Sequence, residues 1–353
     1  MWPSATNPAA LLPSRMPDLP RTRAHLEQGL RNNLWSGYSL AVRKDGQAME
    51  LAGGDIPCPS AAVPWFSAGK PVTAVGALRI LESKPSLESQ PISVSLPELA
   101  GTYAGGLGLK DILSHQTGLR ILESQLRGSD LEIFEYFKKV TPADFKLSAG
   151  QASYDPAGGW WLLGQWINRQ SGMPWKQFLE DQVLHPAGFI GLGFGRADIS
   201  ICDRRAGAWV QGESGAGPGG GLVGSAGQLA LFYKKLWQGG LLQPSSLKKM
   251  LSVMRRDRLD ATFAHVVDFG LGVILNGNRH GADTIPYGFG AKAGDRAFGH
   301  GGARSSMAFA DPDHGFAAAV FLNGRVPEAE HQPRMRALLD LLRSELVSSG
   351  PVP

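Results

Sequence analysis

Cysteine is nearly absent from this chain of 353 residues, which has only Cys58 and Cys202. A disulfide-rich secreted scaffold needs many more cysteines, so the fold must rely on a hydrophobic core. Neither cysteine lies near a pair of histidines at metal-ligand spacing. We therefore expect two reduced, packed thiols, no metal site and no cofactor.

Long apolar runs are also missing. No segment approaches the roughly 18 consecutive apolar residues of a membrane span, so no membrane partner is expected. Residues 1–23 are rich in proline, and their longest apolar stretch covers only residues 9–12. They lack the charged start and apolar core of a signal peptide, so we expect an extended segment and a cytoplasmic protein.

Charge is sparse and balanced. Charged residues make up 19% of the chain, and 35 Lys and Arg against 31 Asp and Glu give a net charge of +4. The densest basic group is short: Arg255, Arg256 and Arg258. No basic stripe is interleaved with aromatic residues, so we expect no nucleic-acid partner.

Glycine and proline are abundant instead. The chain has 46 Gly and 24 Pro, roughly a fifth of all residues against about 12% in average proteins. They follow no G-X-Y period, which excludes collagen. They predict many tight turns and places where the backbone closely approaches another group.

Strand signals lie at both ends of the chain. Residues 37–53 predict a hairpin, with a turn at Asp45 and Gly46. Residues 311–315 have the composition of a hairpin loop, and residues 335–347 predict an amphipathic helix. Three short apolar strands are predicted before that helix: 269–275, 306–310 and 316–322.

Helix signals dominate the middle of the chain. A buried helix is expected over residues 159–170, closed by Gly172. Two capping boxes, each a serine followed three residues later by Glu or Gln, open further helices: Ser129 with Glu132, and Ser225 with Gln228.

These elements predict an α+β fold. Both chain termini build an antiparallel sheet that helices flank, and a largely helical insertion lies between them. We assign residues 24–90 and 262–350 to a sheet subdomain and residues 91–261 to a mainly helical subdomain. The active site is expected in the cleft between the two.

The sharpest local pattern is Ser67-Ala-Gly-Lys70. Pro71 is tolerated only in a first turn, so a helix is expected to begin near Ser67. Residues three apart share a helix face, which brings Lys70 to the Ser67 hydroxyl. A serine is a weak nucleophile unless a base takes its proton, and a lysine of lowered pKa can take it. The pair alone equally fits a serine cap followed by a solvated lysine.

Two further patterns could carry chemistry. Tyr154 directly precedes the predicted 159–170 helix and could shuttle a proton, or simply pack at the helix start. His300 lies in Gly-His-Gly-Gly302, where glycines let a strand edge approach a ligand and backbone N–H groups can bind an oxyanion. His300 would then be a polar or cationic contact; the alternative is a surface histidine at a glycine-rich strand entry.

In this order the three patterns resemble the motifs of the serine β-lactamase and penicillin-binding-protein superfamily, specifically its class C-like esterase and transacylase branch. That group has S-x-x-K, then Y-x-N, then a K/H-T-G-like triplet on a strand. Residues 111–119 and 219–223 are also similar to family segments, and the first places His115 in a packing role. The resemblance covers nearly the whole chain, residues 38–346.

The resemblance implies a role for each motif. Ser67 attacks a carbonyl and becomes acylated, and Lys70 helps to deprotonate it. Tyr154 matches the family's catalytic tyrosine, a general base or relay. His300 matches the Lys or His of the third motif, which tunes Tyr154 or contacts substrate. The oxyanion hole is expected at the backbone N–H groups of Ser67 and Ala303.

Candidate substrate contacts follow from the same motifs. Asp155 could bind a cationic substrate group, or serve as a turn residue before Pro156. Gly301 and Gly302 lie on the expected strand edge. Trp65 could line an apolar pocket, although buried tryptophan is more often core, and the same holds for three others: Trp160, Trp161 and Trp209.

Two positions depart from the family pattern. Pro156 stands where Y-x-N has its Asn, and Gly301 stands where the third motif has a hydroxyl. Both losses weaken a β-lactam or cell-wall peptide reading, because the family holds those substrates with these side chains.

What remains predicts a serine acyl hydrolase or acyltransferase of small-molecule metabolism, with an acyl-Ser67 intermediate. Its donor would be an ester, thioester or amide, and its acceptor water, an amine or an alcohol. Two alternatives stay open: a β-lactamase or D-amino-acid peptidase, and an inactive binding module of the same fold.

Overall fold

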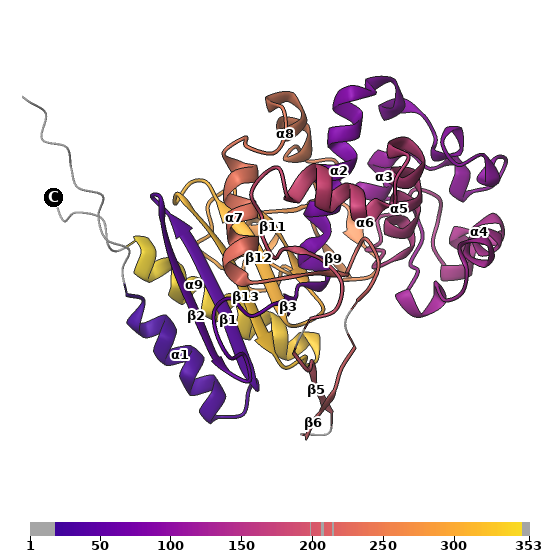
Figure 1. The fold of residues 1–353 in the computed structure, drawn as a ribbon. Helices are drawn as coiled ribbons and strands as arrows, with labels where there is room; N and C mark the ends of the chain where they lie inside the picture. Colours follow the sequence, from indigo (N-terminus) through magenta and orange to yellow (C-terminus); the bar gives the residue numbers. More distant parts are fainter. Residues whose placement is uncertain (1–17, 198, 206–207, 214, 348–353) are drawn as a thin grey trace, which may run out of the picture.

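A six-stranded antiparallel sheet lies at the centre of the computed structural model, in the order β10-β11-β12-β13-β1-β2 (Figure 1). The structure describes residues 18–347 except 198, 206–207 and 214. The strands come from both ends of the chain, which confirms the predicted α+β fold: β1 (Gly37–Lys44), β2 (Gln47–Gly54), β10 (Ile274–Leu275), β11 (Phe298–Gly302), β12 (Ser306–Asp311) and β13 (Phe316–Asn323).

Strand β13 joins the two ends of the chain. It pairs with β12 on one side and with β1 on the other, where Tyr38 lies opposite Leu322. Every residue of β13 is buried. Because successive side chains point to opposite faces, its apolar residues divide between the two cores, and both faces of the strand need them. The continuous apolar run of β13 therefore reflects a sheet that is covered on both sides.

Helices cover both faces of this sheet (Figure 1). Helices α1 (Pro20–Arg31) and α9 (Glu328–Val347) contact each other and pack on one face. Helix α7 (Ala226–Trp237) packs on the other face, against β1, β12 and β13. The division of the chain into subdomains stays a prediction.

The start of α1 corrects one expectation. Residues 20–23 form the first helical turn and are not extended; residues 1–17 lie outside the described part. Pro20 suits this position because the first N–H of a helix has no intrahelical partner. The hydroxyl of Thr22 donates a hydrogen bond of 2.6 Å to Glu345, which ties α1 to α9.

The segment between β2 and β10 is largely helical. Its helices are α2 (Lys70–Ser83), α3 (Leu109–Leu113), α4 (Asp130–Lys139), α5 (Gly158–Ser171), α6 (Trp175–Phe178), α7, α8 (Pro244–Met250) and a π-helical turn, Leu179–Leu184. Short 3-10 turns, one of them beyond β10, are Phe66–Gly69 (η1), Pro85–Ser89, Ile92–Val94, Pro97–Leu99, Ala104–Gly106, Glu123–Gln125 (η6), Pro142–Phe145 and Asn278–His280.

Small β elements accompany these helices. A three-stranded sheet has the order β3-β7-β4, and two hairpins pair β5 with β6 and β8 with β9. Their bounds are β3 (Val63–Pro64), β4 (Gly193–Phe194), β5 (Cys202–Arg205), β6 (Ala208–Gln211), β7 (Leu222–Gly224), β8 (Leu259–Asp260) and β9 (His265–Val266).

The predicted helix caps are formed, with one exception. Ser129 and Glu132 make both bonds of a capping box at the start of α4. Helix α5 ends at Gly172, whose φ of 74° is left-handed, as predicted. Ser225 caps α7, but the side-chain oxygen of Gln228 is buried without a hydrogen-bond partner, so the reciprocal half of that box is missing.

Three smaller expectations need correction. The predicted strand 269–275 shrinks to Ile274–Leu275, because the Gly270 N–H donates to the Val273 carbonyl at 2.9 Å and closes a turn. Helix α9 begins at Glu328 rather than 335 and contains Pro333. Both cysteines are free, but Cys58 is exposed rather than packed.

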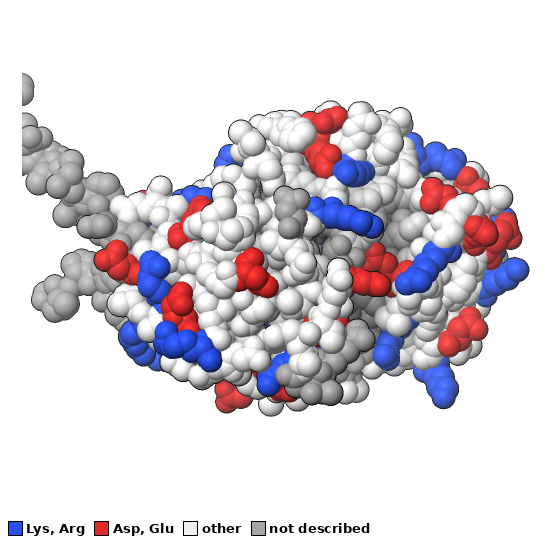
Figure 2. Space-filling model, turned by 60° about the horizontal axis from the view of Figure 1, so that its bottom comes forward, with Lys and Arg blue, Asp and Glu red and all other residues white. Residues whose placement is uncertain are grey.

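No helix among the described residues is both long and apolar enough to cross a bilayer. The cellular location stays a prediction. Acidic and basic side chains are interspersed over the face shown in Figure 2.

Candidate active site

Ser67 lies in η1, the single 3-10 turn directly before α2, where the sequence predicts a helix start. The preceding residue, Phe66, has a φ of 51°, which is uncommon for a residue with a side chain. Pro71 occupies the first turn of α2, where a missing N–H costs nothing. At this position Ser67 borders a cavity.

Lys70 lies beside Ser67, as the spacing predicts. Its Nζ is 3.1 Å from the Ser67 Oγ and donates to the carbonyls of Pro156 and Gly219 at 2.9 and 2.7 Å. The side chain is fully buried. Burial lowers the pKa of Lys70 to about 7, because the charged form loses its hydration.

The hydrogen bonds of Lys70 orient its free electron pair. A carbonyl oxygen only accepts, so each of the two carbonyls needs one N–H of the amine. A neutral amine has two N–H groups and one lone pair. Once deprotonated, Lys70 therefore directs its lone pair at the remaining neighbour, the Ser67 Oγ.

Tyr154 contacts Ser67 from the other side. Its phenol donates a hydrogen bond of 2.7 Å to the Ser67 Oγ. The ring packs against His115 and Phe263, with centroids 4.5 and 5.0 Å away. Burial raises the pKa of Tyr154 well above its usual value, although the hydrogen bond to Ser67 opposes the shift. The phenol is thus protonated at neutral pH and acts as a donor.

His300 lies on β11 and is only 2% exposed, so the surface-histidine reading is wrong. Its Nδ1 is 2.7 Å from the Gly301 carbonyl, which only accepts, so Nδ1 carries the proton. Nε2 is buried and has no hydrogen-bond partner among the described residues. Burial, assisted by the charge of Lys70, lowers the pKa of His300 to about 3. His300 is therefore neutral, which leaves the polar contact of the two expected alternatives.

The expected oxyanion groups line one cavity. Ser67 and Ala303 both border it. Ala303 and Arg304 have φ values of 40° and 59° in the turn after β11, closed by a bond of 2.9 Å from the Ser305 N–H to the Gly302 carbonyl. A Cβ on Gly302 would lie 2.3 Å from the Trp65 carbonyl, so only glycine lets β11 lie this close to η1.

Gly301 is a glycine for a different reason. A Cβ built on it would lie 1.8 Å from the Tyr287 ring. The Tyr287 hydroxyl donates to Glu328 at 2.8 Å, which ties the ring to the start of α9. The space that a hydroxyl-bearing side chain needs at position 301 is therefore already filled.

Asp155 does not face the cavity, contrary to one expectation. It is 1% exposed, and its carboxylate accepts from the backbone N–H groups of Ile121, Gly158 and Gly159 at 2.9, 3.0 and 2.7 Å. Burial raises its pKa, while these bonds oppose the shift. Asp155 holds the start of α5, as its turn-residue alternative suggests.

His115 supports the same segment. It is fully buried, and its Nδ1 accepts a hydrogen bond of 3.0 Å from the Asp155 N–H. This contact and its packing on Tyr154 agree with the packing role that the resemblance implies.

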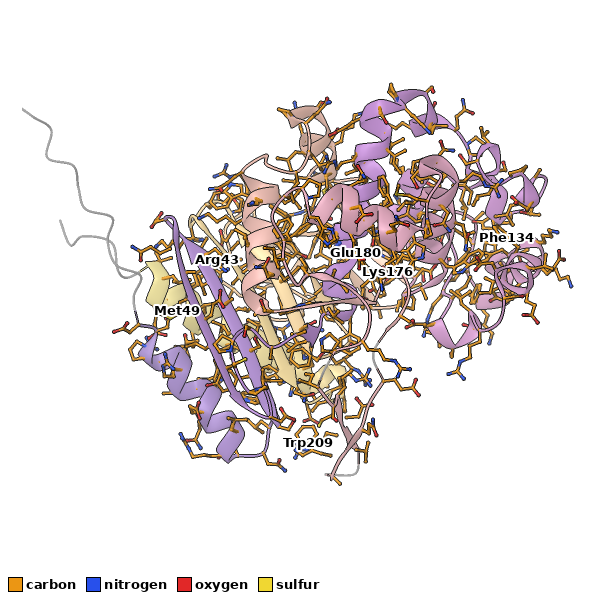
Figure 3. All side chains as sticks on the ribbon, viewed as in Figure 1. Arg43, Met49, Phe134, Lys176, Glu180 and Trp209 are labelled. Carbon is orange, nitrogen blue, oxygen red and sulfur yellow. The ribbon has the colours of Figure 1, made fainter. Side chains whose placement is uncertain are left out.

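The tryptophans divide between core and cavity. The Trp65 side chain is fully buried and donates to the Gly224 carbonyl at 3.0 Å, so it is core, contrary to one expectation. Trp160 is buried beneath Lys70, whose Nζ lies 4.9 Å from the ring. Trp209 lies on the β5–β6 hairpin, well apart from Phe134 on α4 (Figure 3). Of the four candidates, Trp161 borders the cavity.

The cavity itself has a volume of about 390 Å³. Besides Ser67 and Ala303, its lining comes from four segments: Phe66; Glu123 and Leu126; Pro156, Ala157, Trp161 and Trp175; and the loop from Gly215 to Gly220.

Comparison with known proteins identifies the family. The family model described as Beta-lactamase matches residues 23–343. The chain belongs to the β-lactamase family. None of the curated protein sequences is significantly similar to it.

Several solved structures share the fold of this chain. A penicillin-binding protein homologue from Caulobacter crescentus has a TM-score of 0.74 at 21% identity, over 94% of this chain and 98% of its own. EstCE1, a hydrolase with promiscuous acyltransferase activity, has 0.73 at 16%, over 90% and 97%. A D-stereospecific amidohydrolase from Streptomyces has 0.69 at 18%, over 91% and 98%.

The loop from Gly215 to Gly220, called the roof loop below, is hydrogen-bonded to α2. The sequence motifs do not reveal this contact. Lys70 bonds the Gly219 carbonyl, and the Thr73 hydroxyl donates to the Pro218 carbonyl at 2.6 Å. A Cβ on Gly219 would lie 2.8 Å from Trp160 and 3.0 Å from the Lys70 Nζ. The spacing of Thr73, three residues after Lys70, is the one signal that suggests this contact.

Glu123 and Trp175 are two further lining residues that the sequence reasoning misses. The Glu123 carboxylate accepts from the N–H groups of Ala216 and Gly217 at 2.8 and 3.3 Å, which ties η6 to the roof loop. Both residues are far from Ser67 in the sequence, so no local sequence pattern predicts that they line the cavity.

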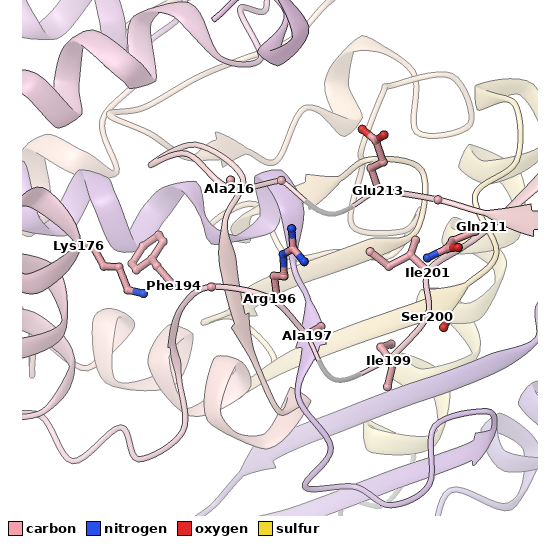
Figure 4. A pocket seen from close by; sticks show the side chains of 13 residues that line it. Lys176, Phe194, Arg196, Ala197, Ile199, Ser200, Ile201, Gln211, Glu213 and Ala216 are labelled. Atoms are coloured by element: carbon pink, nitrogen blue, oxygen red, sulfur yellow. The ribbon is translucent and has the colours of Figure 1, made fainter. Parts of the chain in front are cut away.

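A second, larger pocket of about 730 Å³ lies beyond the roof loop and shares Gly215 and Ala216 with the first (Figure 4). Polar and charged side chains border it, including Lys176, Arg196 and Glu213. Ser67 does not border it, so the smaller cavity is the candidate active site.

One cluster in the described part of the chain has metal-ligating side chains: Asp257, Asp268 and His280. Arg279 already pairs with Asp257 and Asp268 at 2.9 and 2.8 Å. Its guanidinium supplies the positive charge that a cation would bring, and we assign no metal to the cluster.

Proposed function

We propose that the chain is a serine acyl hydrolase or acyltransferase that works through an acyl-Ser67 intermediate. One observation carries this proposal: the Ser67 Oγ lies 3.1 Å from the Lys70 Nζ and 2.7 Å from the Tyr154 hydroxyl, at the wall of a cavity. A nucleophile, a base of lowered pKa and a proton donor thus meet at one atom.

Acylation would proceed in three proton transfers. Neutral Lys70 takes the Ser67 hydroxyl proton as Oγ bonds to the substrate carbonyl carbon, and the carbonyl oxygen becomes an oxyanion facing the N–H groups of Ser67 and Ala303. The carbonyl re-forms as the bond to the leaving oxygen, sulfur or nitrogen breaks. Tyr154 gives its proton to the leaving atom and regains one from Lys70.

The second half reverses these roles. Water, an alcohol or an amine attacks the acyl carbon and gives its proton through Tyr154 and Lys70. Ser67 regains its hydrogen as the ester bond breaks. Neutral His300 offers the lone pair of Nε2 as an acceptor but carries no charge.

The substrate class is an ester, thioester or amide of a small molecule. EstCE1 is a hydrolase with acyltransferase activity, and a second similar structure is an amidohydrolase, which fits this class. The β-lactam reading is less favoured, because Pro156 and the Tyr287 ring occupy the places of the two side chains that the family uses to hold such substrates.

Intact-mass measurement with activated esters, thioesters and amides tests the proposal. We expect one acyl group per chain on the native protein, none on Ser67→Ala, and full labelling of Ser86→Ala, which changes an exposed serine outside the cavity lining. Labelling that persists in Ser67→Ala would contradict the assignment, and so would no labelling by any donor.

A further inference from the structure

We infer that the cavity beside Ser67 is an acyl-binding pocket that selects an uncharged, apolar acyl chain. This inference rests on the proposed function, since it names the substrate group that Ser67 would receive. Three features of the cavity support it: packed aromatic side chains, other apolar lining residues, and the charges of the lining.

Two tryptophans form walls that their neighbours hold in place. Trp161 stacks on Phe137, with centroids 5.3 Å apart and planes at 12°, and meets the edge of Phe134 at 5.0 Å. Trp175 packs at 89° and 5.0 Å against Phe194. Aromatic rings buttressed in this way present apolar surface without the entropy cost of ordering flexible side chains on binding.

Other lining groups are apolar as well. The side chains of Phe66, Leu126, Ala157 and Pro218 border the same cavity, and the remaining roof residues are glycines and Ala216. Among the described lining residues only Ser67 has a hydroxyl group, and its Oγ is the atom to which the acyl carbon would bond.

Charges on this lining are already used. Glu123 is the only ionisable side chain among the described lining residues. Its carboxylate accepts hydrogen bonds from two backbone N–H groups of the roof loop. Lys70, which bonds Ser67 and two carbonyls, is fully buried and does not border the cavity. An acyl chain ending in a carboxylate would enter a cavity whose described lining residues include the carboxylate of Glu123 but no Lys or Arg. A charge that is buried without a partner is costly.

Energetics set the size of the expected preference. A cavity of about 390 Å³ holds several methylene groups besides the reacting carbonyl. Burying one methylene changes binding by about 0.8 kcal/mol, which corresponds to about fourfold per methylene in kcat/KM if the chain is buried in the transition state.

A series of p-nitrophenyl esters tests this on the native protein. We expect kcat/KM to rise about fourfold per methylene from acetyl through butyryl to hexanoyl esters. The adipoyl monoester, which has the length of the hexanoyl ester but ends in a carboxylate, should react at least tenfold more slowly than it. A flat series, or equal rates for hexanoyl and adipoyl esters, would overturn the inference.

A matched pair of variants locates the pocket. Leu126 is half-buried and lines the cavity, whereas Leu122 is exposed on the same turn and does not. Leu126→Asp should lower kcat/KM for the hexanoyl ester at least tenfold and for the acetyl ester by less than threefold. Leu122→Asp should leave the chain-length dependence unchanged. Equal effects of the two variants would place the acyl chain elsewhere.

Failure of this inference is separable from failure of the proposed function. An acyl-Ser67 adduct with no chain-length or charge preference refutes the pocket and keeps the enzyme. No adduct with any ester of the series refutes the proposed function itself.

Discussion

The Tyr154 phenol donates its hydrogen bond to the Ser67 Oγ at 2.7 Å, and burial keeps that phenol protonated at neutral pH. The Ser67 proton must therefore leave in another direction. Lys70 is the neighbour that can take it, since the pKa of its buried amine falls to about 7. In the proposed mechanism the two residues therefore differ in role: tyrosine is the acid and lysine the base.

Activity should depend on pH through Lys70. Below its pKa of about 7 the amine is protonated and has no lone pair, so kcat/KM for a neutral ester should fall about tenfold per pH unit. Above that pH it should reach a plateau. Steady-state rates between pH 5 and 9 measure this.

His300 provides the control for that profile. Its pKa of about 3 means that it does not titrate between pH 5 and 9, so His300→Gln should keep the limb near 7 even if its rate is lower. Loss of the limb in this variant would assign it to histidine instead.

Tyr154→Phe removes the donor to Ser67 and keeps the ring that packs on His115 and Phe263. We expect kcat/KM to fall by about 10²- to 10⁴-fold, the usual contribution of a positioned proton donor. The melting temperature should change little. An activity within threefold of the native value would remove Tyr154 from the mechanism.

Asp155→Ala should act on stability rather than on substrate choice. Three backbone N–H groups at the start of α5 and that of Ile121 lose their acceptor, which should cost about 1–3 kcal/mol in the free energy of unfolding. Denaturant titration measures this loss. KM should change equally for cationic and neutral esters; a selective loss for cationic esters would restore the substrate-contact role.

Gly301→Ala should be destabilising, because the added Cβ would lie 1.8 Å from the Tyr287 ring. Overpacking of this kind costs about 1–3 kcal/mol. Gly106→Ala is the matched control, since a Cβ there meets nothing within 4 Å. Gly301→Ser should not create turnover of a chromogenic β-lactam, and rapid turnover by this variant would show that the Tyr287 ring does not block the position.

Much of the fold is predictable because its signals are local. The turn at Asp45 and Gly46 joins β1 to β2, and Ser129 caps α4 as its spacing indicates. The strand predicted over 269–275 fails where local and tertiary preferences compete: its residues are apolar, yet Gly272 adopts a φ of 76° and the chain turns. Helix α9 begins seven residues before the predicted start at 335, and it contains Pro333.

The candidate site divides in the same way. Ser67 and Lys70 are three residues apart on one turn, so their meeting is dictated by helix geometry. Tyr154 is 87 residues from Ser67 in sequence and could be joined to it only by the family resemblance. Asp155 and Trp65 were misread as substrate contacts, because their burial depends on segments far along the chain.

By itself, the sequence determined the two-ended sheet, the caps and the Ser67–Lys70 pair, since each depends on periodicity or on neighbours within one turn. Tertiary structure alone decided the chemical state of the site. Burial shifts the pKa of Lys70, Tyr154 and His300. The Tyr287 ring occupies the space that a side chain at position 301 would need. These properties depend on the residues that surround each side chain and exclude water from it. Those residues are far apart in the sequence and meet only in the folded chain.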